Sequence, residues 1–179
     1  MIFMAIPTTI SLENAKKDKL FYFVANVVVY RASDKRCLLL KRSSQEKAHP
    51  GKYCVPGGKL EWKNLPLDKP TRINGDILDY EHVAEDLLAR EVEEEAGIVI
   101  ERRLRYLNSV AFIRPDGIPV VLMKFAAKYL SGEVTPEEGA FTHHVWVDAQ
   151  EAKGYDCIKG IPEEIEETIR LFHDARHGA

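Results

Sequence analysis

Four glutamates stand within five positions near the middle of the chain, in the segment AREVEEEAGI at residues 89–98: Glu91, Glu93, Glu94 and Glu95. A helical period runs over residues 81–96, and Gly97 follows as a residue suited to the left-handed end of a helix. At about 100° of rotation per residue, Glu91, Glu94 and Glu95 share one helical face and Glu93 points away. Carboxylate oxygens are preferred ligands of Mg²⁺ and Mn²⁺, so this face could bind a divalent cation.

The three glutamates continue the apolar stripe of the same helix, which runs through Ala84, Leu87 and Leu88. An apolar stripe packs against the sheet, whereas a merely solvated charge run lies on the opposite side of the helix. Like charges three and four residues apart repel, and each anion near the helix C-terminus costs about 0.3–1 kcal/mol. These costs favour a bound cation. The alternative is an acidic helix end that faces solvent or a basic partner.

Strands and a second helix flank this helix along the chain. Apolar, aromatic and β-branched residues predict strands on both sides of it, at residues 20–30, 36–42, 99–113, 118–130 and 144–147. A short strand in YCVPGG is expected to end at Pro56 and the two glycines. Pro162 opens a last helix with Ile165, Ile169 and Phe172 on one face. This order predicts a mixed sheet with helices packed on it.

Residues 63–80 interrupt the pattern. Two closely spaced prolines in NLPLDKP exclude a regular element there. Asn74-Gly75 between apolar flanks predicts a hairpin with a type I′ turn. The segment is expected to be either a specificity flap over a cleft or a neutral surface insertion, because long loops add little closure entropy.

Length and composition fit one domain over residues 1–179. The net charge of −3 provides no basic field for nucleic acid or an anionic membrane, although a small nucleotide needs only a few local cations. Cys37, Cys54 and Cys157 are widely spaced and form no CxxC pair, which predicts reduced thiols in a cytoplasmic protein. No segment predicts a signal peptide or a membrane span. A homodimer through the N-terminal segment or the last helix is compatible with the sequence.

Two segments, GGKLE at residues 57–61 and REVEEEAGI at residues 90–98, together resemble the Nudix box, G-x5-E-x7-R-E-U-x-E-E-x-G-U, where U is aliphatic. The second segment matches every fixed position. The stretch between Gly58 and Arg90 is about eighteen residues longer than the family pattern, which corresponds to the insertion at about 63–80. Eight positions before Arg90, where the box has its first glutamate, this chain has His82.

The resemblance implies an α/β (α+β) fold: a Nudix-type α/β/α sandwich with a mixed sheet, the box helix at residues 81–96 and a C-terminal helix. It also implies a divalent-metal-dependent hydrolase that cleaves a pyrophosphate bond in a nucleoside diphosphate linked to a group X. The residues that match the family's motif imply catalytic roles for Glu91, Glu94 and Arg90, and metal binding by Glu91, Glu94, Glu95 and the backbone of Gly57. The expected cofactor is Mg²⁺ or Mn²⁺.

Substrate binding is predicted for Arg42, Gly58 and Lys59, which flank the expected site. The general base is predicted to be one of the helix glutamates, or Glu137 or Glu138 in a later acidic loop.

The favoured substrate is a nucleoside triphosphate or a related small nucleotide, and sugar nucleotides and dinucleotides stay open. Two non-enzymatic alternatives remain. A Nudix-like module could sense a nucleotide and regulate a partner, although three mutually repelling metal ligands argue against this. An acidic interaction surface would require the three glutamates to face solvent.

Overall fold

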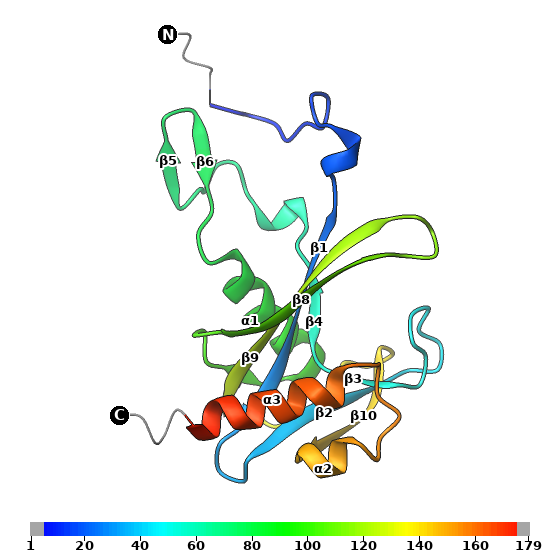
Figure 1. Ribbon diagram of the computed structural model, residues 1–179. Helices are drawn as coiled ribbons and strands as arrows, with labels where there is room; N and C mark the ends of the chain where they lie inside the picture. The colour runs from blue at the N-terminus through cyan, green and yellow to red at the C-terminus, as the bar shows by residue number, and fades with distance from the viewer. Residues whose placement is uncertain (1–5, 175–179) are drawn as a thin grey trace.

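The computed structural model of the chain describes residues 6–174. Its largest feature is an eight-stranded mixed sheet: β1 (Tyr22–Arg31), β2 (Arg36–Arg42), β3 (Tyr53–Cys54), β4 (Gly57–Lys59), β7 (Val99–Ile100), β8 (Arg105–Ile113), β9 (Pro119–Ser131) and β10 (Phe141–Val147). The strands run in the order β10-β2-β1-β9-β7, with β3 joined to β2, β4 to β1 and β8 to β9. The predicted mixed sheet is therefore confirmed (Figure 1).

Strand β1 is the centre of this sheet and changes partners along its length. It pairs in parallel with β9 over nine residues. On its other side, its first half pairs with β4, from Val24↔Lys59 to Asn26↔Gly57, and its end pairs with β2 at Tyr30↔Cys37. β2 and β4 thus occupy different parts of one edge of β1, and the sheet is split between them.

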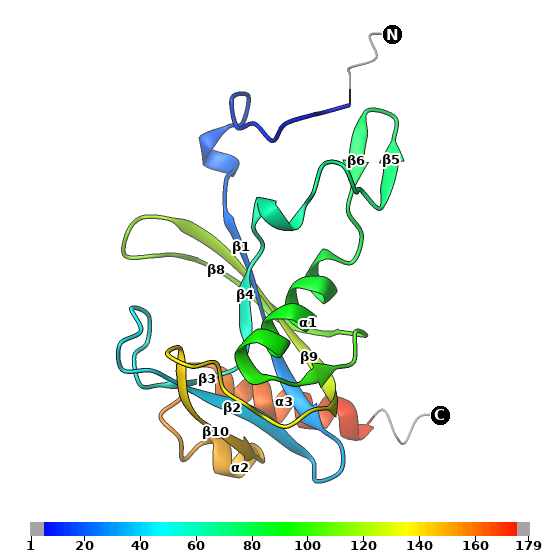
Figure 2. The same cartoon turned by 180° about the vertical axis from the view of Figure 1, so that it is seen from behind.

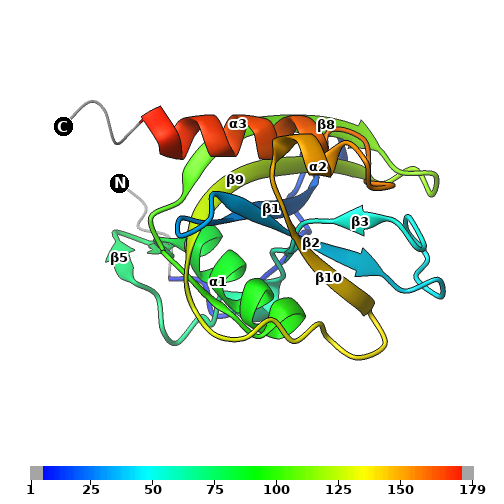
Figure 3. The same ribbon diagram turned by 90° about the horizontal axis from the view of Figure 1, so that it is seen from below.

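Two long helices cover opposite faces of the sheet. The helices are α1 (Val83–Ala96), the short α2 (Ala149–Ala152) and α3 (Ile161–Asp174), with two 3₁₀ turns, η1 (Lys17–Lys19) and η2 (Trp62–Asn64). Figure 3 shows α1 and α3 on the two sides of the strands. This arrangement confirms the expected α/β/α sandwich.

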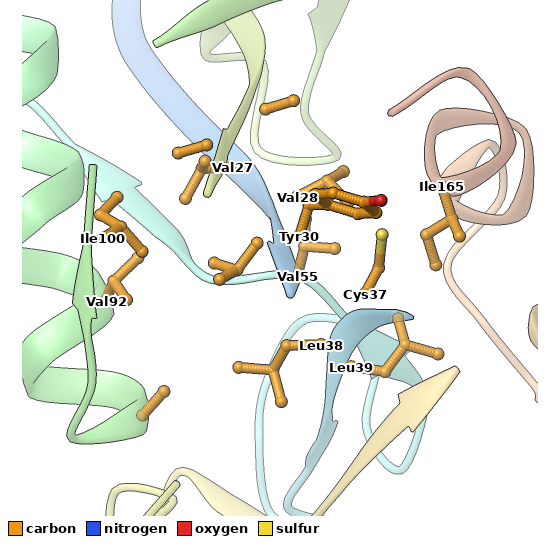
Figure 4. Close-up of a cluster of buried hydrophobic side chains, with 14 of the residues drawn as sticks. Val27, Val28, Tyr30, Cys37, Leu38, Leu39, Val55, Val92, Ile100 and Ile165 are labelled. Carbon is orange, nitrogen blue, oxygen red and sulfur yellow. The ribbon is translucent and has the colours of Figure 1, made fainter. Parts of the chain in front are cut away.

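The hydrophobic core lies on both faces of β1 because successive side chains of a strand alternate. Val92 of α1 lies on the side of Val27, and Ile165 of α3 lies on the side of Val28 and Tyr30 (Figure 4). Tyr30 also stacks on Phe172 of α3, with ring centroids 5.1 Å apart. Burial of these apolar surfaces fixes the distance of each helix from the sheet and so positions the polar residues at their ends.

Three predicted boundaries were wrong. The box helix begins at Val83 rather than at residue 81, because His82 adopts a left-handed conformation with φ of 60°. The region 99–113 is two strands, since residues 101–104 leave the sheet between β7 and β8. The glycine pair does not end a strand but forms most of β4, where Gly57 and Gly58 pair with Asn26 and Ala25.

The insertion at 63–80 contains the predicted hairpin, β5 (Arg72–Asn74) with β6 (Ile77–Asp79), as a separate two-stranded sheet. Its turn is centred on Gly75 and Asp76, and only Gly75 has a positive φ. A type I′ turn needs positive φ at both central residues, so that prediction was wrong. Figure 2 shows the hairpin standing away from the sheet, beyond the start of α1.

None of the helices within residues 6–174 is both long and apolar enough to cross a membrane. The assignment of residues 1–179 to a single domain stays a prediction.

Candidate active site

The C-terminal half of α1 lies against β4, and two glycines make this contact possible. A Cβ atom added to Gly58 would lie 2.2 Å from the carboxyl carbon of Glu91. A Cβ atom on Gly57 would lie 2.4 Å from the carbonyl oxygen of Ala25. The Gly57 N–H donates a hydrogen bond of 3.0 Å to Glu95 Oε2. Two carboxylates of the helix therefore meet the backbone of the glycine pair directly.

Arg90 contacts both of the predicted catalytic carboxylates, Glu91 and Glu94. Its guanidinium lies 2.7 Å from Glu91 Oε1 and 2.9 Å from Glu94 Oε2. The side chain of Glu91 is 15% exposed, whereas that of Glu94 is 54% exposed. The apolar stripe thus continues through Glu91 and Glu95 into the interface with β4, and Glu94 lies at the rim. Glu93 is exposed, as the helical wheel predicts.

The two inner carboxylates are difficult to ionise where they lie. Burial raises the pKa of Glu95 to about 8, and the nearby charges of Glu91 and Glu137 act in the same direction. The Gly57 hydrogen bond and Arg42 oppose this rise. Burial also raises the pKa of Glu91, against the effect of Arg90. A buried carboxylate with few positive charges near it has a raised pKa. A cation that binds beside it stabilises the ionised form.

These donors suit a hard divalent ion, because each offers carboxylate oxygen. Glu91 and Glu95, four residues apart on one face of α1, are the two that converge on the glycine pair. Within residues 6–174, no group of three or more His, Cys, Asp or Glu side chains is arranged to hold a metal ion. Glu91 and Glu94 both contact Arg90, so these carboxylates must turn from Arg90 for the predicted three-carboxylate site to form.

A pocket of about 260 Å³ opens beside Glu95 at the split between β2 and β4. Gly57 and Arg42 line it together with Glu95. Arg42 is held by two contacts from the following loop: its Nε donates to the carbonyl of Ala48 at 2.8 Å and its Nη2 to Glu46 at 2.5 Å. A guanidinium at the edge of a pocket beside carboxylates suits an anionic phosphate bridged by a metal ion.

The other two residues predicted to bind substrate have different positions. Gly58 faces Glu91, as described above. Lys59 is exposed and lines a second pocket, of about 790 Å³, together with aromatic residues that include Tyr22 and Trp62. Of the three predicted substrate residues, Arg42 is the one that shares the pocket with Glu95.

The departure at His82 has a structural counterpart. The His82 side chain is 71% exposed, and its nearest carboxylate is Glu85 at 3.9 Å. Glu61, however, lies near Glu91 and contributes to raising its pKa. Lys63 lowers the pKa of Glu61, and Arg90 adds to this effect. Glu61 is the last residue of the GGKLE motif. Counting back from Arg90 by the spacing of the Nudix box leads to position 82 instead, so this count does not identify Glu61.

Five further polar residues line the 260 Å³ pocket and were not predicted as site residues: Asn26, His49, Lys124, Lys159 and Glu164. Asn26, Lys124 and Glu164 come from β1, β9 and α3, which are far apart in the sequence. Of the two loop glutamates proposed as general bases, Glu137 lies close enough to Glu95 to raise its pKa. Its backbone N–H also donates to the carbonyl of Glu95 at 3.0 Å.

Comparisons with known proteins identify the family and the fold of the chain. The NUDIX domain family model matches residues 22–165. NAD-capped RNA hydrolase NudC of Photobacterium profundum is 35% identical over 95 residues, which are 52% of this chain but only 34% of that protein. The chain thus spans about a third of the length of NudC.

Solved structures of other family members share the fold. The MutT protein of Methanosarcina mazei Go1 aligns with a TM-score of 0.59 and 20% identity, over 87% of this chain and 98% of that one. The MutT NUDIX hydrolase of Burkholderia pseudomallei aligns with a TM-score of 0.57 and 22% identity, over 85% and 98% of the two chains. Because the family model covers well over half of the sequence and the fold agrees, the chain belongs to the Nudix hydrolase family.

Proposed function

We propose that this chain is a divalent-metal-dependent pyrophosphohydrolase that cleaves a nucleoside diphosphate linked to a group X. The observation that supports this most directly is the pair of buried carboxylates, Glu91 and Glu95, held against Gly57 and Gly58 beside a pocket that contains Arg42. The preferred substrate is a nucleoside triphosphate or a related small nucleotide, because the 260 Å³ pocket admits one base-sized group next to these carboxylates.

Glu91, Glu95 and Glu94 would hold Mg²⁺ or Mn²⁺, with the backbone of Gly57 as a neighbouring group. The bound ion would neutralise the diphosphate oxygens and lower the pKa of a coordinated water. Arg90 sets the positions of Glu91 and Glu94 by contacting both. Arg42 would bind a phosphate oxygen through its guanidinium.

The reaction adds water to one phosphorus and breaks the bond from that phosphorus to the bridging oxygen. The departing phosphate keeps the bridging oxygen, and a carboxylate must accept a proton from the attacking water. Glu137 is the loop candidate for this role, because it lies near Glu95 and is exposed. No covalent enzyme intermediate is needed.

A dinucleotide is the second candidate substrate. The match to NudC, whose name describes hydrolysis of NAD-capped RNA, favours it over a sugar nucleotide. A dinucleotide contains the same diphosphate between two nucleosides, so the same carboxylates and Arg42 would serve. The larger pocket beside Lys59 and Trp62 offers space for the second nucleoside.

The test is a substrate panel with Mg²⁺ or Mn²⁺: nucleoside triphosphates, dinucleotides including NAD, nucleotide sugars and NAD-capped RNA. Released phosphate, pyrophosphate and mononucleotides are quantified by chromatography and phosphate detection. Glu94→Gln should lower turnover at least about 100-fold, as expected for a group that acts directly in the chemistry. Glu93→Gln, one position away and exposed, should keep wild-type turnover.

If the protein binds a nucleotide but turns over none of these compounds, the proposed function would change from an enzyme to a nucleotide-sensing module. Full activity of Glu94→Gln would remove that residue from the metal site while leaving the hydrolase assignment intact.

A further inference from the structure

The 790 Å³ pocket is formed largely by segments that the family pattern does not include. One part of its wall is the segment before β1, which contributes Lys17 and Phe21, whereas the family model begins at residue 22. Another part is η2, at the start of the insertion, which contributes Trp62. Figure 1 shows both segments at the same end of β1. The pocket therefore depends on features that this chain adds to the family pattern.

Backbone hydrogen bonds hold the η2 part of the wall in place. The N–H of Leu60 donates to the carbonyl of Phe23 at 3.1 Å, which joins the chain after β4 to β1. The N–H of Leu65 donates to the carbonyl of Trp62 at 2.9 Å and closes the 3₁₀ turn. Trp62 is thus presented from a hydrogen-bonded turn that is fixed to the central strand of the sheet.

The pocket combines aromatic surface with two cations that have no counter-charge. Ten of its thirteen lining residues are apolar or aromatic. Trp62 and Phe21 are each 51% exposed, and neither ring contacts another ring or a cation within residues 6–174. Lys17 and Lys59 form no ion pair with any residue of the same range. Large exposed apolar side chains gathered in one hollow are typical of a binding site.

The proposed metal site adjoins both pockets. Lys59 lines the larger pocket and directly follows Gly58, the residue against which the Glu91 carboxylate lies. Glu95 lines the 260 Å³ pocket. A diphosphate bound at Glu91 and Glu95 would therefore have its nucleoside beside one pocket and its group X beside the other.

We propose that Trp62 and Phe21 bind an aromatic base in group X, so that the enzyme accepts a second nucleoside as X in preference to a sugar. The base stacks on the exposed indole of Trp62, and Lys17 and Lys59 supply positive charge for the phosphates. A flat base gains from stacking while its polar edge stays in water. A sugar would instead place hydroxyl groups against apolar walls without hydrogen-bond partners, which is unfavourable. This assignment rests on the proposed function and specifies X.

A small ligand suits this surface better than a second copy of the chain. The pocket volume lies within the range of about 300–1,000 Å³ that is typical of small-molecule sites. Two copies paired through the same surface would bring Lys17 and Lys59 of both chains together without any counter-charge. Phosphate groups provide that counter-charge.

The experiment compares two substrates that differ by one base. Diadenosine diphosphate and ADP-ribose share adenosine, the diphosphate and a second ribose, but only diadenosine diphosphate has a base on that ribose. With Mg²⁺, Trp62→Ala should lower kcat/KM for diadenosine diphosphate relative to ADP-ribose about 5- to 100-fold, mainly through KM, because one stacked base contributes about that factor. Trp62→Phe keeps a stacking ring and should retain most of the ratio. Tyr106→Ala, a comparably exposed aromatic residue of β8 outside this pocket, should keep the wild-type ratio.

Tryptophan fluorescence gives a second readout that needs no turnover. The chain has two tryptophans, Trp62 and Trp146. Quenching that is present in the wild type and absent from Trp62→Phe therefore comes from Trp62. Without divalent metal, diadenosine diphosphate should quench Trp62, and ADP-ribose should quench it less.

An equal fall of kcat/KM for both substrates in Trp62→Ala, or no quenching of Trp62 by diadenosine diphosphate, would overturn the assignment of X. A dimer that Trp62→Ala dissociates in sedimentation, without such quenching, would also overturn it, because a second copy would then cover this surface. Hydrolysis of both compounds with the same ratio in every variant refutes the assignment of X but not the proposed function. Base-dependent quenching without hydrolysis of any diphosphate compound refutes the proposed function but not the base site.

Discussion

Replacing Glu95 with glutamine should change how the stability of the protein depends on pH. Burial raises the pKa of the folded Glu95 carboxyl to about 8, from the ordinary value of 4.5. The folded state therefore binds a proton more tightly than the unfolded state does. This contribution to stability is fully present below pH 4.5 and is lost as the pH rises through 8. Above that range, the folded protein must hold a poorly solvated carboxylate beside Glu91 and Glu137.

The size of the effect follows from the free energy of one pKa unit. Between about pH 6 and pH 8, each pH unit removes about 1.4 kcal/mol, so about 3 kcal/mol is lost by pH 9. In a chain of this length, that loss should lower the melting temperature by roughly 6–12 °C. Glutamine keeps an oxygen that can accept the Gly57 hydrogen bond but does not ionise, so Glu95→Gln should lack this part of the pH dependence.

The measurement is thermal unfolding at four pH values from 6 to 9 in a chelating buffer, for wild type, Glu95→Gln and Glu93→Gln. Glu93 is exposed on the same helix and should retain the wild-type slope. Comparing slopes between variants cancels the groups that titrate in all three proteins. Equal slopes for wild type and Glu95→Gln would refute the reasoning, because Glu95 would then ionise normally in the folded state.

Added Mg²⁺ provides a second readout of the same site. An ion that binds the folded protein raises its stability according to its concentration relative to Kd. Since binding requires ionised carboxylates, the stabilisation of the wild type should grow from pH 6 to pH 9. Glu95→Gln should show less stabilisation at every pH. A Mg²⁺ effect that is identical in both proteins would place the ion elsewhere.

Four glycine and core substitutions test how the site is supported. Gly58→Ala should keep the fold but lower activity about 10- to 100-fold, because the new methyl displaces only the flexible end of Glu91, measured by turnover and circular dichroism. Gly57→Ala should instead destabilise the protein by about 1–3 kcal/mol in urea unfolding, because the clash is with the backbone of Ala25; the reverse ranking of the two variants would contradict the geometry. Gly97→Ala should cost about 1 kcal/mol, because Gly97 has a φ of 69°, and an unchanged urea midpoint would contradict this. Ile165→Ala should cost about 2–5 kcal/mol in the same assay, because Ile165 of α3 is fully buried against the sheet; a loss below 1 kcal/mol would mean that the core closes around the gap.

The spacing of apolar and acidic residues was sufficient to predict the box helix and the helix face that packs against the sheet. The helical period placed Glu91 and Glu95 on the inner side, and the structure buries both beside β4. It could not separate Glu94 from the other two. Glu94 lies at the rim, where its side chain is 54% exposed and contacts Arg90.

Errors occurred where chain geometry overrides local preference. Gly57 and Gly58 have weak strand propensity, yet they form β4, because only residues without a Cβ can approach β1 and Glu91 so closely. The inserted hairpin lengthens the chain between the two halves of the box. Counting back from Arg90 therefore gives His82, whereas Glu61 is the residue that lies near Glu91. Spacing within a motif is reliable only where the chain between its parts has constant length.

The link between the carboxylates and the polar end of the pocket depends on four non-local contacts. Gly57 donates to Glu95 on one side and pairs with Asn26 on the other. Asn26 in turn pairs with Lys124, and Lys124 contacts Glu164 at the start of α3. A single row of residues across the sheet therefore joins the proposed metal site to the Lys124–Glu164 pair at the other end of the pocket. Because Gly57 contacts both β1 and Glu95, a shift of β4 against β1 should displace the Glu95 carboxylate and lower turnover.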